Sequence, residues 1–82
     1  MKLPIIKHFQ KNNHVQKLEH AIEVLESFSE HRSVKEEEMD VVGELITNIA
    51  GAIEMDKMVK DGMSEKDAAN TFAKRVLGSI DQ

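Results

Sequence analysis

The feature that most constrains this chain is an uninterrupted helical pattern that runs from about Val34 to Lys60. Apolar residues recur there at spacings of three and four, no proline interrupts them, and Gly62 follows as a left-handed terminator. A helix of about 27 residues is roughly 40 Å long at 1.5 Å per residue. A compact globule of 82 residues is only ~30 Å across. We therefore expect one long central helix that extends beyond the rest of its own chain.

The start and the interior of this long helix carry two further signals. The Ser33 hydroxyl and the Glu36 carboxylate have the spacing of a capping box, in which each group satisfies a free backbone N–H. Gly43 and Gly51 lie in the interior, where each glycine costs ~1 kcal/mol relative to alanine. A close crossing by another helix is one reason for these glycines, and a kink or break near Gly51 is the alternative.

Shorter helical segments precede and follow the long one. Pro4 suits the first turn of a short helix that ends near Lys11, because its missing N–H costs nothing there. A second helix is predicted from His14 to Glu30, and a last one follows Ser64, whose hydroxyl caps it. The sequence thus predicts an all-α fold of three main helices and a short N-terminal helix, in a single domain over residues 1–82.

Composition argues against several classes of protein. The chain has no cysteine, which excludes disulfides and thiolate zinc sites and fits a reducing cytoplasm. Its net charge is −4, and such an acidic domain lacks the basic face that nucleic acid requires. No apolar run approaches the ~18 residues of a membrane span. We expect a cytoplasmic protein that binds neither nucleic acid nor a membrane.

The apolar surface of the long helix is wide as well as long. Between Val41 and Ile53 it spans about 180° at 100° per residue, whereas a helix with one packing face needs little more than ~100°. Either the other helices of the same chain or the same helix of a second chain would cover the excess. A homodimer explains length and width together and enlarges a small core. The residues expected in the core or the oligomer interface are Val42, Leu45, Ile46, Ile49 and Ile53.

No group of residues has the spacing of a known chemical site. The four histidines form no i, i+4 pair, and none follows a glutamate by three residues as in di-iron bundles. His20 and Glu23 are close enough on one helix to share a surface metal, but solvation of both is the simpler interpretation. The acidic run at residues 36–38 suits a helix start, where the dipole favours negative charge. We expect no catalysis, no cofactor and no metal.

Several segments carry a resemblance that extends over nearly the whole chain. They are Gly43-Glu44-Leu45-Ile46-Thr47-Asn48 and Gly51-Ala52-Ile53-Glu54 within residues 39–62, the opening Met1-Lys2-Leu3-Pro4, and the tail from Asn70 to Asp81. In these segments the chain resembles a small family of uncharacterised bacterial proteins. The resemblance implies a bacterial cytoplasmic protein and supplies no activity, cofactor or residue roles.

These patterns together predict a non-catalytic helical module that mediates protein interaction or oligomerisation, most simply as a dimer. The alternative is a helical bundle that binds a small molecule or a metal. In that case Glu44, Asn48 and Glu54, on the polar flank of the long helix, would line a cleft. The pathway and the identity of any further partner do not follow from the sequence.

Overall fold

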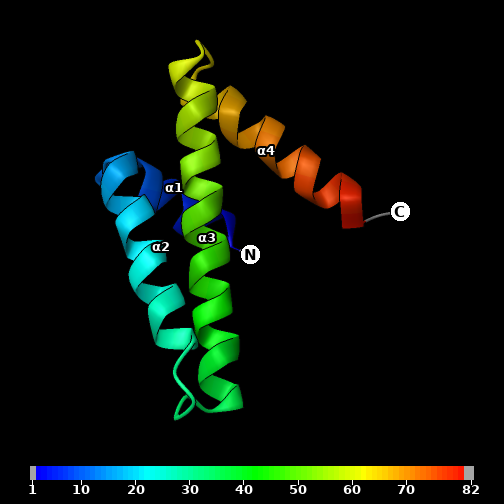
Figure 1. The fold of residues 1–82 in the computed structure, drawn as a ribbon. Helices are drawn as coiled ribbons and strands as arrows, with labels where there is room; N and C mark the ends of the chain where they lie inside the picture. Colours follow the sequence, from blue (N-terminus) through cyan, green and yellow to red (C-terminus); the bar gives the residue numbers. More distant parts are fainter. Residues whose placement is uncertain (1, 81–82) are drawn as a thin grey trace.

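The computed structural model describes residues 2–80, with side chains described as far as Arg75. It contains the helices α1 (Leu3–Asn12), α2 (Val15–Ser29), α3 (Glu36–Lys60) and α4 (Glu65–Ile80), and no strand within residues 2–80. The predicted all-α fold with one long central helix is therefore confirmed. Figure 1 shows α3 as the axis of the molecule, with α2 beside it, α1 crossing behind it and α4 diverging from its C-terminal end.

The long helix begins two residues later than the sequence predicts. α3 starts at Glu36 after the N-cap Lys35, whose backbone N–H donates to the Glu38 carboxylate at 2.9 Å. The Ser33 hydroxyl lies instead 2.7 Å from the His31 ring. The predicted capping box is therefore wrong, because the His31 ring engages the Ser33 hydroxyl and Glu38 supplies the capping carboxylate.

Local signals at the other helix ends act as the sequence predicts. Pro4 lies in the first turn of α1. Gly62 follows α3 with a φ of 112°, a conformation that glycine adopts readily. The Ser64 hydroxyl accepts the Asp67 backbone N–H at 3.0 Å and so caps α4. Each signal depends on residues within one turn of the helix end, which is why the sequence alone reveals it.

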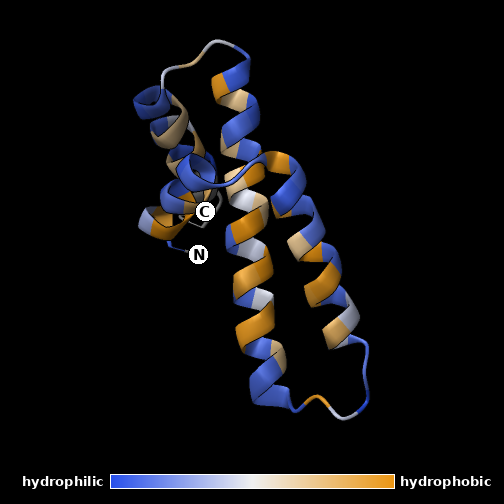
Figure 2. Cartoon of the chain, turned by 90° about the vertical axis from the view of Figure 1, so that its left-hand side faces the viewer, coloured by the Kyte–Doolittle hydropathy of each residue, from blue (hydrophilic) through white to orange (hydrophobic). Residues whose placement is uncertain are grey.

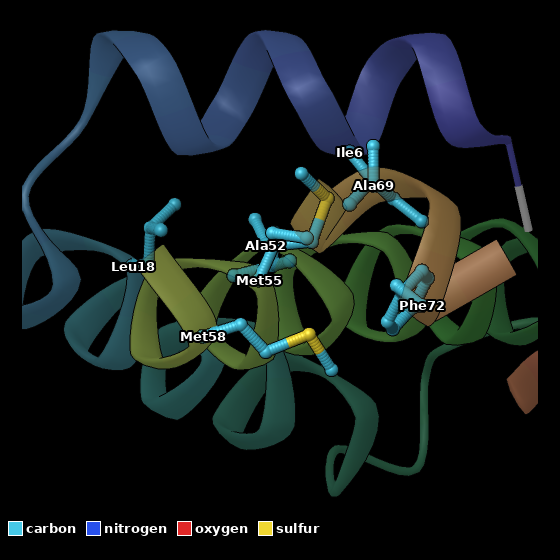
Figure 3. Close-up of a cluster of buried hydrophobic side chains, with 9 residues drawn as sticks. Ile6, Leu18, Ala52, Met55, Met58, Ala69 and Phe72 are labelled. Carbon is cyan, nitrogen blue, oxygen red and sulfur yellow. The ribbon is translucent and has the colours of Figure 1, made fainter. Parts of the chain in front are cut away.

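Side chains from all four helices form one hydrophobic core around the C-terminal half of α3. Each of the other helices packs against α3, and α1 also contacts α4. Figure 3 shows these side chains converging on α3. The buried members are Ile6, Leu18, Ile49, Ala52, Met55, Met58, Ala68, Ala69 and Phe72. Helices of the same chain therefore cover much of the wide apolar surface of α3.

α3 continues through Gly51, so the alternative of a break there is wrong. Gly51 is buried where α1 and α4 approach α3. A Cβ on this residue would lie 3.0 Å from Phe72 Cζ and 3.1 Å from Ile6 Cδ1. Gly43 is exposed, and a Cβ there would meet nothing within 4 Å. The close crossing thus explains Gly51 but not Gly43.

The chain is broad and thin. Its extents are 43 × 32 × 16 Å and its radius of gyration is 13.8 Å, against about 12 Å for a compact domain of this length. Its accessible surface is 5978 Å², against about 5,000 Å² for a folded monomer of 9.3 kDa. Figure 1 shows two reasons: the N-terminal part of α3 extends beyond α1 and α4, and α4 diverges from α3.

We predict that Gly51→Leu lowers the free energy of unfolding by about 1–3 kcal/mol, because the new side chain would overlap Phe72 and Ile6. The matched control Gly43→Ala should raise it by about 0.5–1 kcal/mol, since alanine favours the helix and meets no neighbour there. Urea denaturation followed by far-ultraviolet circular dichroism measures both changes. A Gly51→Leu protein as stable as the wild type would contradict the close crossing.

Candidate interaction surface

The five residues predicted for the core or the interface have three different environments. Val42 and Ile49 are buried, each with 7% of its surface exposed. Ile46 and Ile53 are half-buried. Leu45 has 38% of its surface exposed and therefore lies outside the core of the single chain. Here α2 covers one side of α3 (Figure 1), and the segment before α1 reaches only Glu44 and Asn48, which leaves Leu45 exposed.

Four exposed apolar residues lie on one flank of the hairpin that α2 and α3 form. On each helix two of them are four residues apart, about one turn, and therefore share a face. On α2, Val24 directly precedes Leu25, which is turned inward, and on α3, Val41 directly precedes Val42, which is also turned inward. The two helices are antiparallel and face each other. A residue that directly precedes the inward position therefore lies on the same side of the hairpin in both helices. The four residues, which we call the apolar flank, are Val24, Phe28, Val41 and Leu45.

The apolar flank is strongly exposed in the single chain. Val24 and Val41, at its centre, have 68% and 60% of their surfaces exposed, and Phe28 has 43%. Figure 2 shows hydrophobic segments on both helices of the hairpin, over the stretch that α1 and α4 leave open. Scattered exposed apolar residues are ordinary, whereas an apolar patch larger than those of typical monomers indicates an interaction surface.

The polar residues proposed to line a cleft are instead each held by another helix. The Lys2 backbone N–H donates to Asn48 Oδ1 at 2.9 Å, and Lys2 Nζ lies 3.7 Å from the Glu44 carboxylate. Glu54 pairs with Arg75 of α4. These contacts join the segment before α1, and α4, to α3, whereas in the alternative of a ligand-binding bundle the same three side chains would line a cleft.

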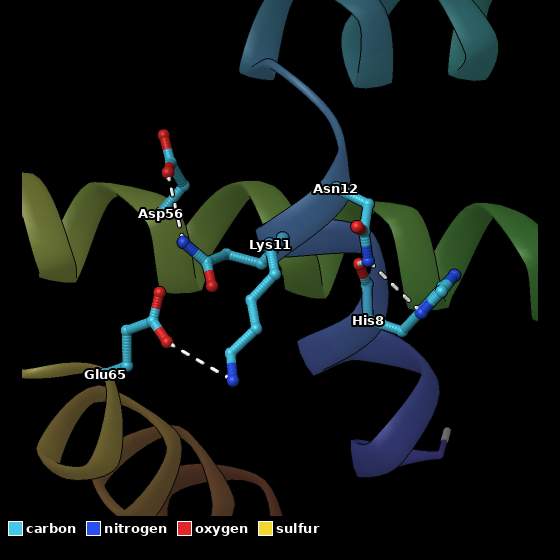
Figure 4. A network of polar contacts seen from close by, with 6 residues as sticks. His8, Lys11, Asn12, Asp56 and Glu65 are labelled. Atoms are coloured by element: carbon cyan, nitrogen blue, oxygen red, sulfur yellow. Dashed lines mark hydrogen bonds and ion pairs between the residues drawn. The ribbon is translucent and has the colours of Figure 1, made fainter.

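A second polar cluster lies where α1 meets the C-terminal half of α3. Gln10, only 8% exposed, donates its Nε2 to Asp56 Oδ1 at 3.3 Å, and Lys60 Nζ lies 2.9 Å from Asp56 Oδ2. The hydrogen bond from Lys60 lowers the pKa of Asp56 below its usual 3.8, with a smaller contribution from Gln10 and against the effect of burial. Asp56 is therefore ionised at neutral pH. Figure 4 shows Asp56 in this region, with the Lys11–Glu65 ion pair nearby.

Sequence spacing gave no sign of this second cluster. Gln10 and Asp56 are 46 positions apart, and neither belongs to a motif. A glutamine at a position turned inward on a short amphipathic helix is the signal that was available, because a buried amide needs a partner.

Neither a metal-binding group nor a membrane-spanning helix occurs within the described residues. In this part of the chain, no three or more His, Cys, Asp or Glu side chains gather so that they could hold a metal ion. None of its helices is both long enough and apolar enough to cross a bilayer.

One serine–histidine pair forms that the sequence did not predict. His31 Nδ1 lies 2.7 Å from Ser33 Oγ and accepts the Ser33 backbone N–H at 3.1 Å. Both residues are exposed in the loop between α2 and α3. Among residues 2–80 no carboxylate bonds to this ring, so the pair lacks the third group that orients a catalytic base. Its effect is to close the loop.

Comparison with known proteins gives one match. The model of a family of unknown function (DUF6952) matches residues 1–81. No curated protein and no solved structure matches the chain. The resemblance to an uncharacterised family is thereby confirmed, and a role has to be argued from the surface of the molecule.

We predict that Asp56→Asn destabilises the protein at neutral pH, by on the order of 1 kcal/mol, and that this loss shrinks as the pH falls below 3.8. A carboxylate with a lowered folded-state pKa adds stability above its unfolded pKa and loses it as the pH falls through the folded value. Thermal unfolding of both proteins at about pH 7 and about pH 3 measures the difference. An equal difference at the two pH values would show that ionised Asp56 adds no stability.

Proposed function

Because the chain belongs to the family of unknown function DUF6952, we propose its role from its surface: it is a non-catalytic helical module that forms a homodimer through the apolar flank. The observation that carries the proposal is the exposure of Val24, Phe28, Val41 and Leu45, which helix geometry places on one side of the hairpin. Burying these side chains against a second copy removes apolar surface from water, at about 25 cal/mol per Å².

The surface area of the chain supports a partner of about its own size. The accessible surface of 5978 Å² exceeds that of an average monomer of this mass by about 1,000 Å². A standard protein interface buries about 800 Å² on each partner. The excess is of the same order as one partner's share of such an interface, and it is spread over the overhang of α3 and the diverging α4.

A second copy of the chain is the occupant that we favour. A two-fold dimer uses the same patch on both partners, so a single apolar flank suffices for both halves of the interface. The two added helices would also cover the part of α3 that only α2 accompanies. The proposal places this dimer in the bacterial cytoplasm, a compartment that suits a chain without cysteine.

We predict that the wild type sediments at twice the 9.3 kDa chain mass at micromolar concentration, and Val41→Glu at the mass of one chain. Val41 is exposed in the single chain, so the charge should disrupt the interface without unfolding the helices. Ala50→Glu is the matched control. Ala50 is also exposed on α3, but it follows Val41 by nine residues and thus lies on the opposite side, at about 180°. This variant should stay dimeric.

Sedimentation equilibrium measures the mass of each protein in solution, and circular dichroism verifies its helix content. A wild type that stays monomeric over the whole concentration range would overturn the dimer. A Val41→Glu protein as dimeric as the wild type would overturn the apolar flank as its interface. If both variants dissociated equally, the apolar flank would also be overturned as the interface, because the added charge and not its location on α3 would then cause dissociation.

A further inference from the structure

Opposite charges lie at the two ends of the hairpin that α2 and α3 form. The part around its loop, residues 23–44, carries eight acidic and two basic side chains, a formal charge of −6. Residues 2–20, which form α1 and the start of α2 away from the loop, carry four lysines and one glutamate, a formal charge of +3. All of these charged side chains are exposed. The molecule is therefore electrically polar along the hairpin.

One charge of each sign borders the apolar flank itself. Glu37 precedes Val41 by four residues on α3, and Lys17 precedes Val24 by seven residues on α2, so each shares a face with a flank residue. Glu37 lies on the loop side of the flank and Lys17 on the opposite side. Neither side chain forms a salt bridge within the residues whose side chains are described. Both charges are thus available to a partner that covers the flank.

A two-fold dimer through the flank places the two hairpins either in the same direction or in opposite directions. In the parallel arrangement the two loop ends lie together, and a charge of −6 faces a charge of −6. In the antiparallel arrangement the loop end of each chain lies against the α1 end of the other, and −6 faces +3. Like charges brought together raise the free energy of a complex, whereas opposite charges lower it.

We propose that the two chains of the dimer are antiparallel, with Lys17 of each chain beside Glu37 of the second copy. This inference rests on the proposed dimer and adds its orientation. Along the helix axes, Lys17 lies about 14 Å and Glu37 about 9 Å from the middle of the flank on its own helix. The antiparallel arrangement brings these two levels together at both ends of the interface, within the reach of a lysine side chain. Charge complementarity of this kind fixes the orientation of a complex more than its affinity.

Spin labels on the long helix distinguish the two arrangements. The chain has no cysteine, so Lys35→Cys and Asp61→Cys, both at exposed positions, each accept a single label. In an antiparallel dimer the two labels are about 54 Å apart along the helices at residue 61 and about 24 Å apart at residue 35. In a parallel dimer each pair of labels lies at one level, so the two distances are similar. Double electron–electron resonance should show the longer distance at residue 61, at more than about 50 Å.

Exchanged charges test the contact between Lys17 and Glu37. Lys17→Glu and Glu37→Lys should each weaken dimerisation about two- to tenfold in sedimentation equilibrium, as two exposed ion pairs per dimer allow. The double variant Lys17→Glu/Glu37→Lys restores opposite charges across the interface and should recover most of the affinity. Lys66→Glu is the matched control, because it makes the same charge change on α4, outside the hairpin, and should leave the affinity unchanged.

The outcomes separate the orientation from the dimer itself. Similar distances at the two labelled positions would overturn the antiparallel arrangement and leave the dimer in place. A double variant that dimerises no better than either single variant would also overturn it. If neither labelled protein gave a distance between chains, the dimer would be absent and its orientation would fall with it. Val41→Glu in the labelled proteins should abolish both distances, and distances that persisted would show that the chains meet elsewhere than at the apolar flank.

Discussion

α1 and α4 reach α3 together because Gly51 has no side chain. A Cβ at this residue would lie 3.0 Å from Phe72 Cζ and 3.1 Å from Ile6 Cδ1, which come from two different helices and leave too little room for a methyl group. This one contact determines which part of α3 is covered by several helices. The C-terminal half of α3 is covered by three helices, whereas its N-terminal part is covered by α2 alone.

Uneven coverage explains both the shape and the exposed apolar flank. A helix whose apolar arc is wide along its whole length needs neighbours along its whole length, and α1 and α4 supply them only near Gly51. Further toward the N-terminus, Val42 is turned into the hairpin while Val41, its neighbour in sequence, is left in solvent. Helices of the same chain therefore cover the wide apolar surface of α3 at its C-terminal end. The uncovered surface at its N-terminal end is what favours a second copy.

Interactions at the helix ends could be predicted from the sequence, whereas contacts between helices could not. Proline at a first turn, a capping serine and a terminating glycine act within one turn, so Pro4, Ser64 and Gly62 located helix ends. Periodicity predicted four helices but could not tell that Leu45 would face solvent, because that depends on which helix lies alongside. The Gln10–Asp56 bond escaped for the same reason, since it joins residues far apart in sequence.

α1 crosses α3 from a point near the apolar flank to the Gln10–Asp56 contact. A helix of ten residues is not stable by itself, so its docking depends on its anchors. These are the Lys2 N–H on Asn48 near the flank, Ile6 in the core, and Gln10 on Asp56. All three anchors act on one short helix, so the loss of any one of them weakens the docking of the whole helix on α3.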